Sequence, residues 1–183
     1  MGDDAARSEA KRTTLADALA RRRVPLGFVA ACATLILAQP TWQSWRAGLL
    51  VAAAGEAIRI WAAGHLEKGR EVTRSGPYRW TGHPLYLGSA IVALGVVIAS
   101  RSAIVTTLAA AYVGLTFTAA IRSEEAFLHR RFGEAYDRYR QSEAEPMSRR
   151  FGVARARRNR EPRAIAGLAA GFALLALKIV GLL

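Results

Sequence analysis

Two short stretches of the sequence gather residues that could do chemistry at the edge of an apolar segment. The first, SGPYRWTGHPLYLG at residues 75–88, places a Gly-Pro turn and a His-Pro pair directly before a long apolar run. Pro84 suits the first turn of a helix, because its missing N–H would have no partner there. His83 is then expected at the mouth of that helix, with Tyr86 in the first turn and Tyr78 in a loop that faces it. The stretch predicts either a helix start with interfacial aromatic residues or one wall of a polar site.

The second stretch is the pair Glu124 and Glu125, which follows a 20-residue segment without charge. Adjacent carboxylates repel one another, so they must be hydrated, paired with Arg122 or Arg131, or bound to a cationic ligand. Two interpretations follow. The pair is a solvated helix end, or one carboxylate holds an ammonium group.

Glu56 and Arg59 stand three residues apart inside another apolar segment, and so share one face of a helix. Ionisable residues within a membrane are costly and usually face a partner or a polar cavity. The two side chains either neutralise each other structurally or belong to the site. No cluster of His, Cys, Asp and Glu has metal-ligand spacing, and no Gly-rich loop matches a phosphate or dinucleotide fingerprint.

Apolar segments long enough to cross a bilayer must position these residues. Four windows of 17 to 20 residues are nearly free of charge and approach the ~20 residues that span the hydrocarbon core: 47–66, 84–100, 102–121 and 164–183. A shorter run at 24–38 is followed by Trp42 and Trp45, which suit a membrane interface. We therefore predict an all-α integral membrane protein with about five transmembrane helices.

A cytoplasmic amphipathic segment is expected after the fourth span. In RSEEAFLHRRFGEAYDRYR at residues 122–140, Phe127, Leu128 and Phe132 fall at helical spacing against charged neighbours, and Gly133 is a predicted break. We expect this helix to lie along the membrane surface. The predicted organisation is a polar segment at 1–23, a core at 24–163 with site segments 66–88 and 122–145, and a last helix at 164–183, where Gly167 and Gly171 could favour helix contact.

The positive charge of the chain alternates along the sequence. Lys and Arg number six before residue 24, one in the first connection, four in 66–83, one in the next connection and twelve in 122–163. The positive-inside rule then places the N-terminus and both site segments in the cytoplasm, and the C-terminus outside. Richness in Ala and Arg suggests a bacterial plasma membrane.

The basic residues allow two other interpretations. Arg21, Arg22 and Arg23 precede the first apolar run as in a signal peptide, but a polar lead of more than 20 residues is long for one. The net charge of +12 could serve nucleic acid binding, but the excess follows the cytoplasmic ends of the spans. Attraction to anionic lipid headgroups explains it better, so we expect membrane lipids as partners and no nucleic acid.

The motif GPYRWTGHPLYLG, followed about 36 residues later by EEAFLHRRFGEAYDRY, resembles the isoprenylcysteine carboxyl methyltransferase family, a relative of the phospholipid N-methyltransferases. The resemblance covers residues 64–139. Gly82 stands where the family usually has an arginine before His-Pro. QSEAEPMSRR, after the tyrosines, also differs from the usual ending.

The resemblance implies an integral membrane enzyme that holds S-adenosylmethionine at its cytoplasmic side and takes a lipophilic acceptor from the bilayer. By position, it assigns these residues to the cofactor site: Tyr78, His83, Pro84, Leu85, Tyr86 and Glu124. Glu125 is the neighbour of that site, and Arg122 is the nearest match to a substrate-contacting arginine of the family. A carboxylate acceptor would need no base, whereas an amine or phenol would need His83 or Glu125 to remove a proton.

Two further hypotheses remain beside the methyltransferase. Membrane reductases that use NADPH have a similar architecture, and Arg70, Arg74 and Arg79 could contact its phosphates. Alternatively, the protein is a non-catalytic lipid-binding or scaffold protein, in which His-Pro and Glu-Glu only shape helix ends. Cofactor binding separates these hypotheses.

Overall fold

The computed structural model describes residues 25–182, in which the ordered elements are all helical. They are a helix at Pro25–Leu37, then α2 (Trp42–His65), η1 (Gly76–Arg79), α3 (Pro84–Ser100), α4 (Ala103–Phe132), α5 (Glu134–Arg140), α6 (Val153–Arg158) and α7 (Glu161–Ile179). Three of them, α2, α4 and α7, are long and apolar enough to cross a membrane, and Pro25–Leu37 and α3 are shorter apolar helices. The expected all-α multi-pass membrane protein is confirmed. The polar segment predicted at 1–23 lies outside the described residues.

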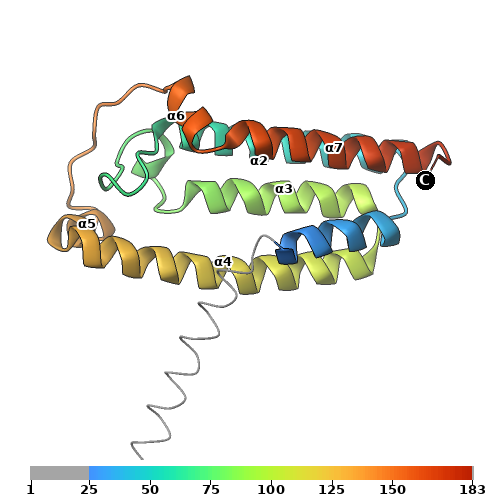
Figure 1. Ribbon diagram of the computed structural model, residues 1–183, viewed down its shortest axis with the longest axis horizontal. Helices are drawn as coiled ribbons and strands as arrows, with labels where there is room; N and C mark the ends of the chain where they lie inside the picture. Colours follow the sequence, from blue (N-terminus) through green and yellow to red (C-terminus); the bar gives the residue numbers. More distant parts are fainter. Residues whose placement is uncertain (1–24, 183) are drawn as a thin grey trace, which may run out of the picture.

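The long helices lie side by side, and most of the connecting chain gathers at one end (Figure 1). This end, called the site end below, holds η1 and its flanking loops together with α5 and α6. The C-terminus and the turn between α3 and α4 lie at the other end. Segments 66–88 and 122–145, predicted as site segments, therefore meet at one end of the bundle.

Helices α2 and α3 pack so closely that their backbones touch. A Cβ added to Gly55 in α2 would lie 2.7 Å from the carbonyl oxygen of Gly88 in α3, and one added to Gly95 would lie 2.5 Å from the amide nitrogen of Ala52. The glycines recur at seven-residue spacing on each helix, so they line one face over two turns. Small residues of this kind let helices approach within a membrane, where apolar burial gives little drive.

The C-terminal helix α7 docks on this pair through large side chains. The indole nitrogen of Trp45 donates to the carbonyl of Phe172 over 2.8 Å. Buried residues around this contact form an apolar core: Ala38, Ala52, Ala99, Phe172 and Leu175. The expectation that Gly167 and Gly171 make a helix contact is wrong for the described chain, because a Cβ at either would meet nothing within 4 Å.

Helix α4 continues past the predicted end of its span. It runs unbroken from Ala103 to Phe132, so the amphipathic helix expected to continue after the fourth span forms its last part. Its 30 residues measure about 45 Å, against ~30 Å for the hydrocarbon core. The helix ends at Gly133, where φ is 48°, and this confirms the predicted break. Glu124 and Glu125 are thus carried on a rigid helix.

The ionisable pair in α2 has a third partner that the sequence did not indicate. The Nε atom of Arg59 lies 3.2 Å from Glu56, and its Nη2 atom lies 3.1 Å from Glu161 at the start of α7. Arg59 also donates to the hydroxyl of Ser89 in α3. The cluster joins three helices, which favours the structural interpretation of Glu56 and Arg59.

Candidate active site

A cavity of about 490 Å³ opens at the site end and is called the main cavity below. Five pieces of chain surround it: loop 66–73, η1, the first turn of α3, the end of α4, and α5. Tyr78, Leu85, Tyr86 and Glu124 all line it. Residues from both sequence motifs therefore share one cavity.

Local backbone geometry places Tyr78 in this cavity. Gly76 has φ of 58°, and a Cβ there would lie 2.5 Å from the His65 ring, so glycine is required on both counts. His65 in turn lies 3.1 Å from the hydroxyl of Ser75 through Nδ1. Burial, and then the nearby Glu124 carboxylate, raises the pKa of the Tyr78 hydroxyl. Tyr78 thus remains a neutral phenol at physiological pH.

Helix α5 closes the cavity from the side opposite the membrane spans. The hydroxyl of Tyr139 donates to the carbonyl of Tyr78 over 2.8 Å and contacts that of Thr81 at 3.4 Å. Burial raises the pKa of Tyr139 to about 12. The ring of Tyr136 lies 6.3 Å from that of Tyr139, because residues three apart share one face of a helix.

His83 and Glu125 face a second, smaller cavity of about 260 Å³. Nε2 of His83 lies 3.2 Å from Oε1 of Glu125, and the guanidinium of Arg140 also pairs with that carboxylate. Pairing with Arg122 or Arg131 was one of three alternatives for the two glutamates, and Glu125 instead pairs with Arg140, which α5 brings to it by folding back. Three tyrosines line both cavities and separate them: Tyr78, Tyr136 and Tyr139.

Two of the predicted site residues lie apart from both cavities. Pro84 is buried in the first turn of α3, where it starts the helix as expected. Arg122 is exposed on α4 and lines neither cavity. The remaining predicted residues fall into two groups, with Glu124 in the main cavity and His83 and Glu125 in the second.

The comparisons with known proteins fall on this part of the chain. The model of a family described as phospholipid methyltransferase matches residues 48–135. This segment is therefore similar to the phospholipid methyltransferase family. The family includes the isoprenylcysteine carboxyl methyltransferase-like proteins, so the resemblance seen in the motifs is confirmed at the level of the family. The match and the apolar helices together suggest a membrane methyltransferase.

One curated relative extends the comparison beyond the family segment. The cobalt-zinc-cadmium resistance protein CzcN of Cupriavidus metallidurans is 31% identical over 121 residues, which cover 61% of this chain. The chain spans 55% of the length of that relative. No solved structure matches the chain.

The residues that the two motifs singled out do not make up the whole cavity. Loop 66–73 supplies six lining residues, of which Lys68 and Thr73 add polar groups that the motifs did not indicate. Arg130 adds a second cation from α4. Nothing in the sequence singles these residues out, because a lysine in a basic loop looks like any other basic residue near the end of a span.

The main cavity combines three kinds of contact. Tyrosine rings can face a cation, and the Glu124 carboxylate can bind an ammonium group or hydroxyls. Lys68 and Arg130 can hold an anionic group. Leu85, Phe127 and other apolar lining residues offer a surface for a lipophilic molecule.

Proposed function

We propose that this protein transfers a methyl group from S-adenosylmethionine to a lipophilic acceptor at the cytoplasmic face of the membrane. The observation that carries the proposal is the main cavity. It is lined mostly by the segment that matches the phospholipid methyltransferase family, and it joins Tyr78 and Tyr86 of the first motif to Glu124 of the second.

The donor set of the main cavity fits this cofactor. S-adenosylmethionine carries a sulfonium, an ammonium and a carboxylate beside its adenosine. Tyr78, Tyr86 and Tyr139 present aromatic faces for the sulfonium, Glu124 suits the ammonium or the ribose hydroxyls, and Lys68 suits the carboxylate. A volume of about 490 Å³ is in the range of small-molecule sites. When bound, the cofactor supplies a methyl group that needs no metal or covalent nucleophile to activate it.

The protein must then align the cofactor with the acceptor and enclose both. For some acceptors it must also remove a proton. Alignment can contribute several kcal/mol to the rate. Tyr78 cannot act as a base, because its raised pKa keeps it protonated. His83 is the better candidate for an amine or phenol acceptor, since Glu125 orients its ring from 3.2 Å and itself pairs with Arg140. A carboxylate acceptor would leave this pair without a role in proton transfer.

The acceptor is proposed to enter from the bilayer between α3 and α4. Leu85 and Phe127 line the main cavity from these two helices, and Phe127 is 45% exposed. An apolar side chain that reaches from the cavity to the outside of the bundle suits a lipid-soluble substrate. The N-terminus is proposed to be cytoplasmic and the membrane to be a bacterial plasma membrane.

Calorimetric titration of the purified protein in detergent tests the proposal, with S-adenosylhomocysteine and NADPH as separate ligands. Saturable binding of S-adenosylhomocysteine alone is expected. Binding of NADPH alone would replace the proposal by a reductase. Binding of neither, by protein whose helical circular dichroism is intact, would favour the non-catalytic hypothesis.

A further inference from the structure

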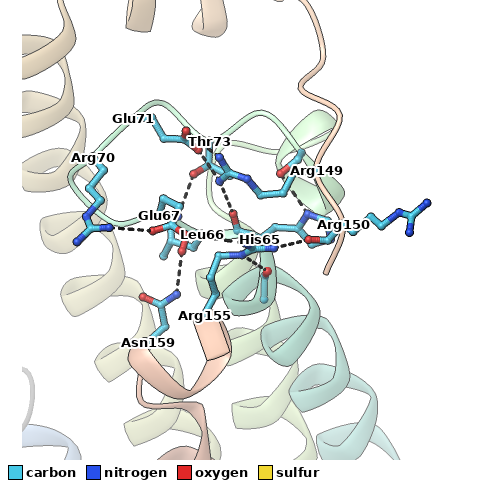
Figure 2. A network of polar contacts seen from close by, with 12 residues as sticks. His65, Leu66, Glu67, Arg70, Glu71, Thr73, Arg149, Arg150, Arg155 and Asn159 are labelled. Atoms are coloured by element: carbon cyan, nitrogen blue, oxygen red, sulfur yellow. Dashed lines mark hydrogen bonds and ion pairs between the residues drawn. The ribbon is translucent and has the colours of Figure 1, made fainter. Parts of the chain in front are cut away.

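The cytoplasmic end of α2 is capped by a segment that follows almost ninety residues later in the chain (Figure 2). The last carbonyls of any α-helix have no partner within the helix. In α2 the carbonyls concerned are those of Ala63, Gly64, His65 and Leu66. Each of the four accepts a hydrogen bond from residues 147–159, a segment called the strap below.

The strap donates from both side chains and backbone. The Asn159 amide group donates to Ala63 over 2.9 Å and to Leu66 over 3.0 Å. Gly64 accepts from the Gly152 amide at 3.0 Å and from Nε of Arg155 at 2.7 Å. The carbonyl of His65 accepts from Arg149 at 3.2 Å. Two of these donors are guanidinium cations, which the negative end of a helix dipole attracts.

The same strap holds the loop that leaves α2. Nη2 of Arg149 donates to Glu71 over 2.8 Å, and Nη2 of Arg158 donates to Glu67 over 3.0 Å. Both bonds are charge-assisted and so are stronger than neutral ones. Figure 2 shows Arg149 of the strap beside Glu71 of the loop. The strap therefore grips loop 66–73, which supplies six of the residues that line the main cavity.

None of Arg149, Arg155 and Asn159 lines the main cavity itself. The strap also lies beyond residue 135, where the match to the family model ends. Its contacts give a role to the last residues of QSEAEPMSRR and to the residues after them, for which the motifs indicated none.

We propose that the strap positions loop 66–73 as a wall of the cofactor cavity, with Arg149 and Asn159 as positioning residues. The inference rests on the proposed function for the identity of the ligand. Without the strap, four carbonyls at the end of α2 and the carboxylates of Glu67 and Glu71 would lose these donors and bind water instead. The loop would then spend part of its time away from the cavity. The apparent affinity for a ligand falls in proportion to the fraction of protein that is competent to bind it.

Two variants test the proposal, Asn159→Ala and Arg149→Gln, with Arg157→Ala as the matched control. Arg157 is exposed on the same short helix as Arg155, so its removal changes charge but not the cap. In both test variants we expect S-adenosylhomocysteine to bind about ten-fold more weakly, because a smaller fraction of the protein holds the loop in the position that binds the ligand. Arg149→Lys keeps the charge near Glu71 but cannot also donate to the carbonyl of His65. Its affinity for S-adenosylhomocysteine should lie between those of wild type and Arg149→Gln.

Hydrogen exchange adds a readout that general destabilisation would not produce. Amides of residues 66–74 should exchange faster in Asn159→Ala, while those of α3 and α4 keep the wild-type rate. Wild-type affinity in both test variants would overturn the proposed role of the strap. Uniformly faster amide exchange across the chain would also overturn it. Failure of wild-type protein to bind S-adenosylhomocysteine would instead overturn the proposed function, and the exchange pattern would still decide whether the strap holds the loop. If Asn159→Ala does not fold, Arg149→Lys carries both measurements.

Discussion

At the scale of single residues, two neighbouring glutamates have different surroundings. Consecutive positions on a helix point about 100° apart, so Glu124 reaches the main cavity while Glu125 reaches His83 and Arg140. The sequence marks both as carboxylates at a helix end and cannot tell which one meets a ligand. The difference arises only when α5 folds back at Gly133 and supplies the arginine.

Replacing Glu124 by glutamine should weaken binding of S-adenosylhomocysteine. The change removes the charge that would bind the ligand's ammonium group or hydroxyls, and a loss of about 2 kcal/mol, or roughly thirty-fold, is expected. Isothermal titration in detergent measures it. Glu134→Gln is the control, since Glu134 is exposed on α5 and pairs only loosely with Arg138 at 3.6 Å. Equal affinity in Glu124→Gln and wild type would remove Glu124 from the site.

The hydroxyl of Tyr139 should make stability depend on alkaline pH. Its pKa of about 12 exceeds the ordinary value of 10, so its stabilisation is complete below pH 10 and is lost as pH rises from 10 towards 12. Thermal unfolding of wild type and Tyr139→Phe should therefore differ below pH 10 by about 1 kcal/mol, the worth of the bond to Tyr78. The difference should shrink between pH 10 and 11.5. A constant difference over that range would contradict the assignment.

At the scale of elements, the sequence predicted which segments are helices better than how they meet. Apolar windows gave the spans, Pro84 gave the start of α3, and Gly133 gave the end of α4. They could not predict which helices pair, because Gly167 and Gly171, four residues apart, look as suited to close contact as the glycines seven residues apart on α2 and α3 that do make it. What separates the two sets is their position relative to a partner helix, which local sequence does not encode.

Alanine at Gly95 should destabilise the bundle, whereas alanine at Gly171 should not. A Cβ at Gly95 meets the backbone of Ala52 at 2.5 Å, and backbone cannot move aside as a side chain can. Overpacking of this kind costs about 2 kcal/mol. At Gly171 there is open space, and the better helix propensity of alanine makes the change neutral or slightly stabilising. Thermal unfolding in detergent compares the two, and equal shifts would rule out close packing of α2 on α3.

At the scale of the whole molecule, charge and chemistry gather at one end. Four basic residues of 66–83 and twelve of 122–163 belong to the site end, whereas Arg101 and Lys178 belong to the other end with the C-terminus (Figure 1). In the sequence this asymmetry is an alternation of Lys and Arg counts between connections. In the fold it becomes a difference in charge between the two ends of the bundle. Both cavities and the strap lie at the basic site end.

The site end should be cytoplasmic, because segments with clustered Lys and Arg are kept from crossing the membrane, as the positive-inside rule describes. In a Cys32→Ser background, which removes the single cysteine, Ser142→Cys at the site end should resist a membrane-impermeant maleimide in intact spheroplasts and react once they are lysed. Leu182→Cys, 70% exposed near the C-terminus, should react in both cases. Arg101→Cys, in the turn between α3 and α4, should behave like Leu182→Cys. Labelling of Ser142→Cys before lysis would place the main cavity outside, away from the cytoplasmic supply of S-adenosylmethionine, and would contradict the proposed function as well as the orientation.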